Sequence, residues 1–342
     1  MEKETTIYDI AKLLNLSPAT VSRALNDHPA INSNTKRIIT ATATEMGYRS
    51  NTFASNLRRQ RTNTIGVIVP RLNSNFMSTV LAGMEKVANK SSYNLIISQS
   101  LESVKKEVAN AKTMFNSRVD GLLVSVAYDT EKTDHFDAFT KKGVPLLFFD
   151  RVLDHKQGTS IVIDNVKAGY EATAHLIGQG CRRIMHVTGS LKRNVYIDRL
   201  EGYRLALLEA GLPYEEELIR MTDLSEEAGI EAASHIQSMA GRPDGLFIAN
   251  DFCAVSCMSA LKRAGLSIPS DIAVVGFNND PVSTVIEPNL TTIDYPGEKM
   301  GEVAAQSLIN HLNGTMNIQT TNRIVLHSEL IVRESSLKSA IF

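Results

Sequence analysis

Eight short apolar runs after residue 64 constrain the fold more than any other feature of the chain. Each run is almost uniformly apolar, and longer segments with helical periodicity separate one run from the next. Strands of a parallel sheet have this composition because helices cover both of their faces. The pattern therefore predicts an α/β architecture of doubly wound parallel sheets. In order, the runs are IGVIVP, NLIISQS, GLLVSV, PLLFFDR, SIVIDN, IMHVTG, GLFIAND and IAVVGFN.

The order of strand, loop and helix that starts at residue 65 starts again at residue 184, which indicates two similar lobes. Lobes of this kind bind ligands at the carboxyl ends of their strands, in the cleft between them. An aromatic ring with Arg, Asp and Asn partners suits a sugar-like polyol. The strand-end residues that we expect to bind such an effector are Asn75, Phe76, Asp150, Arg151, Arg193, Arg199, Asn250, Asp251 and Asn278.

Asp251 and Asp150 in this set also have structural interpretations. Asp251 is placed to cap a helix that begins at Phe252. Asp150 is placed to form a local ion pair with Arg151.

The first 49 residues predict three short helices. Thr6, with Asp9 three residues later, begins the first helix as a capping box. Ser17 is a good cap for the second helix, and Pro18 occupies its first position, where the missing N–H has no partner in any case. The inward residues of the third helix, which starts near residue 32, are expected to be Ile38, Ile39 and Met46.

Two short helices joined by a turn and supported by a third form a helix-turn-helix arrangement. The second helix would bury Val21 and Leu25, so its opposite face could enter the major groove of double-stranded DNA. A three-helix bundle with no DNA partner is the alternative, and the local pattern favours neither. The head residues predicted to face DNA are Thr6, Ser17, Pro18, Ala19, Thr20, Ser22, Arg23, Asn26, Asn32 and Thr35.

Residues 50–62 form a basic segment rich in Asn, Thr and Arg. About ten residues are too few for a stable isolated helix, although Ala54, Leu57 and Arg58 would share one helical face. A segment that becomes helical only on DNA, with Leu57 inserted into the minor groove, fits this composition. A flexible interdomain linker is the alternative.

Charge and composition limit the function classes. Residues 1–61 hold nine Lys or Arg against five Asp or Glu, whereas the rest of the chain holds 27 against 32. A basic head on an acidic body is expected where only the head meets a polyanion. No apolar run is long enough to span a membrane, and no secretory signal is present. The three cysteines fit a reducing cytoplasm, and Cys253 and Cys257 have no histidine nearby to complete a metal site.

Four stretches of the sequence resemble the lactose/galactose-repressor family of bacterial transcription regulators, and they occur in the order found in that family. They are TIYDIAKLLNLSPATVSRALN, NTKRIITATATEMGYRSNTFASNLRRQRTNTIGVIVP, IPSDIAVVGFNN and LTTIDYP. The resemblance implies a DNA-binding head over residues 1–49, a hinge over 50–62 and an effector-binding and dimerisation domain over 63–342. It also implies three crossings between the lobes, which we place near Ile163, Thr291 and Val325. The N-subdomain would hold residues 63–162 and 292–324, and the C-subdomain 163–291 and 325–342.

The resemblance also marks effector-contacting positions. Those matched here are Phe76, Arg193, Arg199 and Asn278, and Val195 and Leu224 complete the expected effector set. Asn278 is an amide where a carboxylate is common in the family, and Leu224 stands where a purine-binding relative would have a stacking aromatic. The second departure disfavours a purine effector. Arg193, with Lys192 beside it, leaves a phosphorylated or acidic sugar open.

These features predict a cytoplasmic regulator, associated with the nucleoid when bound to DNA, with no cofactor and no membrane partner. We expect a homodimer on a palindromic operator, controlled by a sugar or sugar phosphate and repressing carbohydrate-utilisation genes. The short segment after RIVLHSELIVRES favours a dimer over a tetramer. A periplasmic sugar receptor shares the two-lobe body, but the head disfavours it. A sugar hydrolase or kinase is disfavoured because the chain has no catalytic sequence motif.

Overall fold

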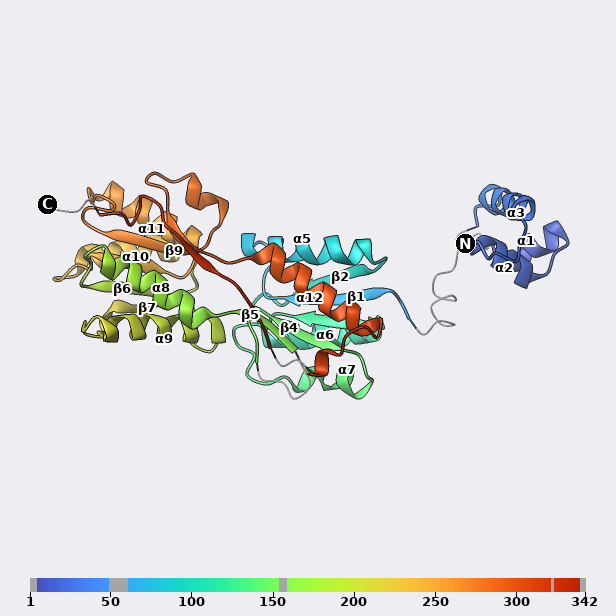
Figure 1. The fold of residues 1–342 in the computed structure, drawn as a ribbon, viewed down its shortest axis with the longest axis horizontal. Helices are drawn as coiled ribbons and strands as arrows, with labels where there is room; N and C mark the ends of the chain where they lie inside the picture. The colour runs from blue at the N-terminus through green and yellow to red at the C-terminus, as the bar shows by residue number, and fades with distance from the viewer. Residues whose placement is uncertain (1–4, 49–60, 154–158, 321–322, 339–342) are drawn as a thin grey trace. The chain divides into compact units, whose positions relative to one another are not determined.

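The structure, a computed structural model, describes residues 5–48, 61–153, 159–320 and 323–338. The chain divides into two compact units, Met1–Thr62 and Asn63–Phe342, each with its own apolar core (Figure 1). We call the first unit the head and the second the body. The predicted hinge contacts Ala54, Leu57 and Arg58 lie outside the described residues.

The described residues of the head form three helices, α1 (Ile7–Leu14), α2 (Pro18–Leu25) and α3 (Ser33–Glu45). Each begins where the sequence provides a cap. The Thr6 backbone N–H donates to the Asp9 carboxylate over 2.8 Å, which forms part of the predicted capping box. The hydroxyl of Ser17 and the side-chain oxygen of Asn32 each accept a hydrogen bond from a backbone N–H three residues later. Pro18 is the first residue of α2, as predicted.

The head core is small and comes from all three helices. One sequence prediction was wrong: Ile38 is 45% exposed, while its neighbour Ile39 is fully buried. Successive helix positions differ by about 100°, so α3 can aim only one of the two at the core. Spacing of four residues along one helix face then adds Ala43. The buried apolar residues of the head are Ile10, Ala11, Val21, Ala24, Ile39 and Ala43.

The first lobe of the body, the N-lobe, has a six-stranded sheet in which every pairing is parallel. Its strand order is β11-β5-β4-β3-β1-β2. Helices α5 (Asn75–Lys90) and α12 (Gly297–Leu312) pack together on this lobe, and α6 (Val104–Asn116) packs against β1 and β2. A short helix, α7 (Asp137–Lys141), completes it. The strands are β1 (Thr64–Val69), β2 (Asn94–Gln99), β3 (Gly121–Val124), β4 (Leu146–Phe149), β5 (Thr159–Ile163) and β11 (Arg323–Leu326).

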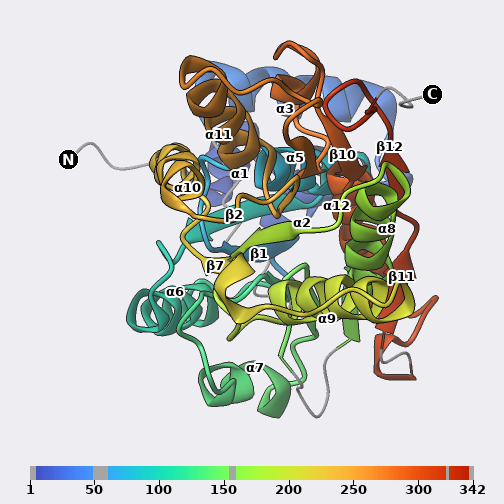
Figure 2. The ribbon, with the colours of Figure 1, turned by 90° about the vertical axis from the view of Figure 1, so that its left-hand side faces the viewer.

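The second lobe, the C-lobe, repeats this plan, with strand order β12-β10-β9-β8-β6-β7. Only the pairing of β12 with β10 is antiparallel. Helices α8 (Asn165–Gly178) and α9 (Asn194–Glu209) pack as one pair, and α10 (Glu226–Ser238) and α11 (Asp251–Arg263) as another (Figure 2). The strands are β6 (Ile184–Thr188), β7 (Ile219–Met221), β8 (Gly245–Ile248), β9 (Ala273–Asn278), β10 (Thr291–Asp294) and β12 (Glu329–Ile331).

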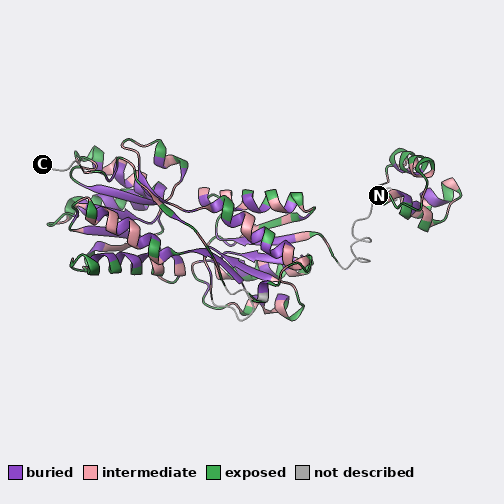
Figure 3. Cartoon of the chain, in the orientation of Figure 1, coloured by how far each residue is buried: buried purple, intermediate pink, exposed green. Residues whose placement is uncertain are grey.

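All eight apolar runs contain the strands predicted from them, and most of these strands are buried (Figure 3). The exception is β2, whose six residues are all exposed or half-buried. Its apolar composition predicted burial on both faces. The strand instead forms the edge of the N-lobe sheet, with Ile96 37% and Ile97 41% exposed.

Three crossings connect the lobes, and two of them differ from the predicted positions. The first lies between β5 and α8, next to Ile163. The second was expected near Thr291, but β10 pairs with β9 in the C-lobe, so the chain crosses only after Asp294. The third was expected near Val325, but β11 pairs with β5 in the N-lobe, so the crossing follows Leu326. Both strands pair with their neighbours before the chain leaves the sheet, and the pairing satisfies their backbone N–H and C=O groups.

Two further properties concern the described residues as a whole. No helix among them is long and apolar enough to cross a membrane. No group of three His, Cys, Asp or Glu side chains in the same ranges is arranged to hold a metal ion.

Candidate functional site

The head presents one face of α2 to solvent. Val21 and Ala24 are buried, whereas Ala19, Arg23 and Asn26 are exposed. Pro18 and Ser22 are half-buried at the border of this face. Helical spacing explains the division, because apolar residues three apart turn to the core together. Ala19, Arg23 and Asn26, with Pro18 and Ser22 at the border, therefore form one accessible surface, which we call the α2 face.

The start of α2 is electrostatically suited to a phosphate. Its first turn contains no acidic residue that would repel a phosphate. The helix has only eight residues, and its last turn adds the positive charge of Arg23. The helix dipole makes such a start attractive to anions. The exposed Ser17 hydroxyl also contacts the Thr20 hydroxyl over 2.8 Å.

Three predicted contacts of the head already have structural partners. Thr6 and Asn32 bind within their own helix starts, at Asp9 and at the backbone of Thr35. The Asn26 side chain donates to the Ser22 carbonyl over 2.7 Å. All three residues are exposed, so the capping roles leave part of each side chain accessible.

In the body, polar and aromatic side chains meet where the two lobes face each other. The hydroxyls of Tyr128, from the loop after β3, and Tyr196, on α9, lie 3.0 Å apart. The Asn194 side chain accepts from the Val152 N–H over 2.9 Å and donates to the Asp150 carbonyl over 3.2 Å. These bonds hold the start of α9 against the ends of the N-lobe strands. We call these side chains, together with Glu102, Arg151, Arg193, Arg199 and Tyr295, the interlobe cluster.

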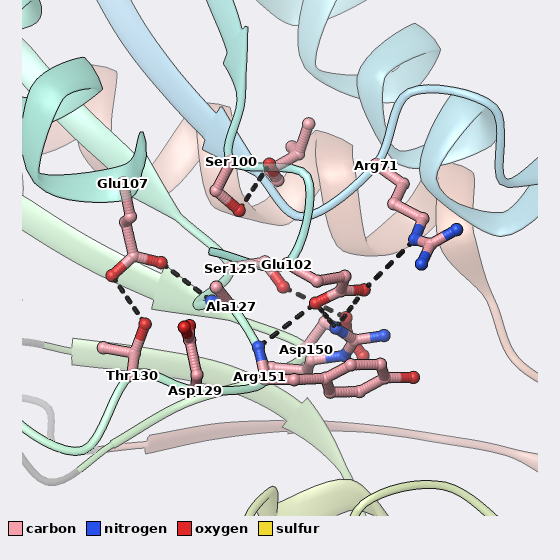
Figure 4. A network of polar contacts seen from close by, with 12 residues as sticks. Arg71, Ser100, Glu102, Glu107, Ser125, Ala127, Asp129, Thr130, Asp150 and Arg151 are labelled. Atoms are coloured by element: carbon pink, nitrogen blue, oxygen red, sulfur yellow. Dashed lines mark hydrogen bonds and ion pairs between the residues drawn. The ribbon is translucent and has the colours of Figure 1, made fainter. Parts of the chain in front are cut away.

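The N-lobe side of this cluster is a polar network at the strand ends (Figure 4). One Arg151 nitrogen donates to both oxygens of Glu102, over 3.0 and 2.9 Å, and the guanidinium lies 4.1 Å from the Tyr128 ring centroid. Arg71 approaches the same carboxylate to 3.6 Å. The local pair of Asp150 with Arg151 was therefore a wrong expectation, because Glu102 takes the arginine.

Asp150 has other partners. It accepts from the Ser125 hydroxyl over 3.1 Å and from the Tyr295 hydroxyl over 2.8 Å. Tyr295 follows β10 at the second crossing, so this bond joins the crossing to the end of β4. Burial raises the pKa of Tyr295 above its ordinary value, and the nearby Asp150 carboxylate adds to the shift.

Glu107 organises the loop that carries Tyr128. Its side chain is fully buried, accepts from the Ala127 N–H over 2.7 Å and from the Thr130 hydroxyl over 3.0 Å, and contacts His135 over 2.9 Å. Three partners on one carboxylate fix the loop at both of its ends.

Arg193 and Arg199 enter the cluster from the C-lobe, and both are almost completely buried. Arg199 donates to the Asn165 side chain over 2.9 Å and to the Ala249 carbonyl over 3.3 Å. Its guanidinium lies 3.5 Å from the Phe277 ring centroid. The sequence named this residue as an effector contact, but these bonds show that it also connects α9 to the C-lobe core.

A cavity of about 510 Å³ opens between the starts of α5 and α12 and the ends of β9 and β10. Phe76 stacks on Tyr295 at its wall, with ring centroids 4.1 Å apart. The Asn75 side chain donates to Asp280 over 2.8 Å and so connects the lobes. Asn278 lines the same cavity and donates to the other Asp280 oxygen over 3.3 Å. The other predicted effector residues do not line it.

The predicted role of Asp251 as a helix cap was wrong by one residue. Asn250 is the cap of α11, and Asp251 is already helical. The buried Asp251 carboxylate accepts instead from the Thr292 hydroxyl over 2.7 Å and from the Asp280 N–H over 2.8 Å. Burial raises its pKa to about 7, and the nearby Asp280 carboxylate adds to the shift.

Val195 and Leu224 belong to the apolar core of the C-lobe, with 2% and 8% exposure. Neither provides a polar group or an aromatic face.

Several residues of the interlobe cluster were missed by the sequence reasoning. Tyr295 and Glu102 follow strands closely, so the strand-end rule could have found them. Tyr128 and Tyr196 could not be paired, because nothing in the sequence relates a loop to a helix 68 residues later.

Both the head and the body resemble known regulatory and binding proteins. Residues 6–51 match the model of bacterial regulatory proteins of the lacI family, and residues 173–336 match the periplasmic binding protein-like domain. The HTH-type transcriptional regulator RegA of Clostridium saccharobutylicum is 33% identical, over 97% of this chain and 99% of the relative. The chain belongs to the lacI family of bacterial regulatory proteins. Family membership makes it a DNA-binding transcriptional regulator and not an enzyme, which confirms the prediction.

Solved structures support the same assignment. A CelR–cellobiose complex is 27% identical, with a TM-score of 0.72 over 97% of this chain and all of the other. A lac repressor dimer bound to operator and the anti-inducer ONPF is 24% identical, with a TM-score of 0.87 over 98% of this chain and all of the other. This second structure confirms the predicted fold, a helix-turn-helix head and a two-lobe α/β body.

Proposed function

We propose that this regulator is a repressor that binds a palindromic operator as a homodimer and responds to a sugar or sugar phosphate between its lobes. The observation that carries the proposal is the α2 face, an accessible polar surface around Arg23 on a helix whose start attracts anions. A helix of this kind enters the major groove with its first turn leading. Such a regulator acts in the cytoplasm, where the nucleoid is accessible.

The tip of the α2 face limits how it reads bases. Pro18 and Ala19 are apolar and can contact thymine methyl groups, but they form no bidentate hydrogen bonds. Arg23 can bind a guanine or a phosphate. We propose that the remaining specificity comes from Leu57 in the minor groove and from the ease with which the operator bends. For Ala54 and Arg58, on the same predicted helical face, we propose backbone contacts.

Dimerisation is supported by the edge of the N-lobe sheet. Strand β2 exposes Ile96 and Ile97 on an unpaired edge, which proteins usually cover or charge. A second copy is the occupant that a palindromic operator requires, because each half-site needs one head. The lac repressor structure of the same fold is a dimer on its operator.

A sugar-like effector is supported by the interlobe cluster. Tyr128, Tyr196 and Asp150 supply ring faces, hydroxyls and a carboxylate of the kind that bind polyols. The related CelR structure holds cellobiose. Leu224, which is buried in the C-lobe core, offers no aromatic ring for stacking a purine.

The proposed control is a shift between lobe arrangements. An effector that binds better to one arrangement changes the spacing of the two hinges in the dimer, and hence the affinity for DNA. The proposed effector residues are Asn75, Phe76, Asp150, Arg151, Arg193, Arg199, Asn250, Asp251 and Asn278.

Selection of DNA by the full-length protein tests the proposal. From randomised duplexes we expect an inverted repeat to be enriched, and native mass spectrometry should count two protomers on each selected duplex. Arg23→Ala should reduce enrichment, while Arg37→Ala, on α3, serves as a matched control for loss of one head charge. An enriched sequence without inverted symmetry, or a single protomer per duplex, would contradict the proposal.

A further inference from the structure

Two guanidinium nitrogens of the buried Arg193 have no hydrogen-bond partner in the described part of the chain. The residue is 2% exposed, and its Nε and Nη1 atoms are buried with no hydrogen-bond acceptor among the described residues. Burying a guanidinium is costly unless its charge is paired and its N–H groups are bonded. A purely structural arginine would have such partners, so Arg193 requires another explanation.

The two other arginines of the interlobe cluster show what satisfied partners look like. Arg151 donates to both oxygens of Glu102 and lies over the Tyr128 ring. Arg199 donates to Asn165 and to a backbone carbonyl. Of the three, only Arg193 has Nε and Nη1 both without an acceptor among the described residues.

The backbone at the same position adds a second attraction for negative charge. Helix α9 begins directly after Arg193 and runs for 16 residues. No side chain caps this helix start, and its first turn has no acidic residue. The Asn194 side chain cannot serve, because it is bonded to residues 150 and 152 of the N-lobe. The helix dipole and the free N–H groups therefore favour an anion here.

The electrostatic surroundings agree with this picture. Burial and the neighbouring charge of Arg151 hold the pKa of Arg193 below its ordinary value, against the opposing effect of Glu107, Asp129 and Glu102. None of these carboxylates forms a hydrogen bond with Arg193. An anion bound at this position would compensate the buried charge directly.

We infer that the effector carries an anionic group, a phosphate ester or a carboxylate, which binds to the Arg193 guanidinium and the start of α9. The inference rests on the proposed function and specifies the ligand class of that same site. A guanidinium binds either group with two parallel N–H···O bonds. The hydroxyls of a neutral sugar could accept from the guanidinium but would add no negative charge beside it.

Matched pairs of ligands test the inference on the full-length protein. Calorimetry and thermal shift would compare glucose with glucose 6-phosphate, ribose with ribose 5-phosphate, and galactose with galacturonate. We expect one anionic member to bind at least about 10-fold more tightly than its neutral partner, as is usual for charge-assisted bonds. The phosphate and carboxylate arms distinguish the two sources of charge.

Variants of Arg193 assign the effect to this residue. Arg193→Met should weaken binding of the anionic ligand by about 10–100-fold, and Arg193→Lys should weaken it less, because the charge remains but the paired geometry is lost. Neutral sugars should bind both variants and the parent protein alike.

The ligand-free protein provides an independent measurement. Arg193→Met removes an unpaired buried charge, so Tm should rise by roughly 2–4 °C. Arg199→Met is the matched control, and it should lower Tm because it breaks formed hydrogen bonds. A fall in Tm for Arg193→Met would show a structural role and overturn the inference.

The remaining outcomes separate the inference from the proposed function. No binding by any anionic member, or equal binding of the anionic ligand with and without Arg193, would overturn the inference. A neutral sugar that alters operator affinity would support the proposed function and refute the anionic ligand. An anionic ligand that needs Arg193 but leaves operator affinity unchanged would support the inference and refute the proposed control.

Discussion

Ser17 allows the stability of the head to be separated from its contact with DNA. Its hydroxyl accepts the Thr20 N–H over 3.1 Å and is exposed beside the start of α2. Loss of an N-cap costs about 1 kcal/mol when the replacement is Ala, and only a few tenths of a kcal/mol when it is Gly. Both substitutions remove the hydroxyl, so they form a matched pair.

The size of the head decides what a loss of stability can do to binding. Six apolar residues are buried in the described part of the head. A single small core of this kind supplies roughly 3–5 kcal/mol. After Ser17→Ala, about 2–4 kcal/mol remain, so at least about 97% of heads stay folded. Unfolding alone therefore changes operator affinity by only about 5%.

A direct phosphate contact gives a much larger effect. Loss of one such hydrogen bond costs about 1 kcal/mol, or about 5-fold in Kd for each head, and roughly 25-fold for two heads. We expect this loss for Ser17→Ala and Ser17→Gly alike in fluorescence anisotropy with the selected operator. Thermal melting of the head should fall clearly only for Ser17→Ala. Unchanged operator affinity in Ser17→Gly would refute the contact and leave Ser17 as a cap alone.

Three further perturbations address the lobes and the hinge. Tyr128→Phe and Tyr196→Phe each break the same hydroxyl contact, so each should make lobe closure less favourable by about 0.5–1.5 kcal/mol. The double variant should have no larger effect than either single variant. Additive losses of the closed population in single-molecule distance measurements would argue against a shared bond. Burial raises the pKa of Asp251 to about 7, above its unfolded value, so its contribution to stability is present at low pH and is lost as pH rises through 7. Denaturant unfolding from pH 5 to 8 should show a decline for the parent protein that is absent in Asp251→Asn; parallel profiles would contradict this. Leu57→Ala should weaken operator binding far more than binding to random DNA, whereas equal losses would make residues 50–62 a plain tether.

The sequence predicted those parts of the fold that depend on local pattern. Eight apolar runs gave eight strands, and the caps at Ser17 and Asn32 gave two helix starts of the head. Positions that depend on pairing were less predictable. The second crossing moved because β10 bonds to β9, a contact that its own four residues do not indicate.

The same distinction between local pattern and distant pairing applies to the interlobe site. Strand-end position was enough to select Asp150, Arg193 and Asn278. The partners of these residues come from distant segments, so the role of Glu102 as the partner of Arg151 appeared only in three dimensions. The unpartnered state of Arg193 is also a property of the packed structure, since a sequence shows which groups are present but not which are left unbonded.

The central claim is that a small molecule between the lobes and DNA at the head affect each other's affinity. Calorimetric titration of the effector into the full-length protein, with and without saturating operator, tests it most directly. Thermodynamic linkage requires that operator change the effector Kd by the same factor by which effector changes the operator Kd, typically about 5–150-fold. The predicted result is that the effector Kd and the operator Kd change by the same factor, within this range. An effector Kd that is identical in the presence and absence of operator would contradict the account.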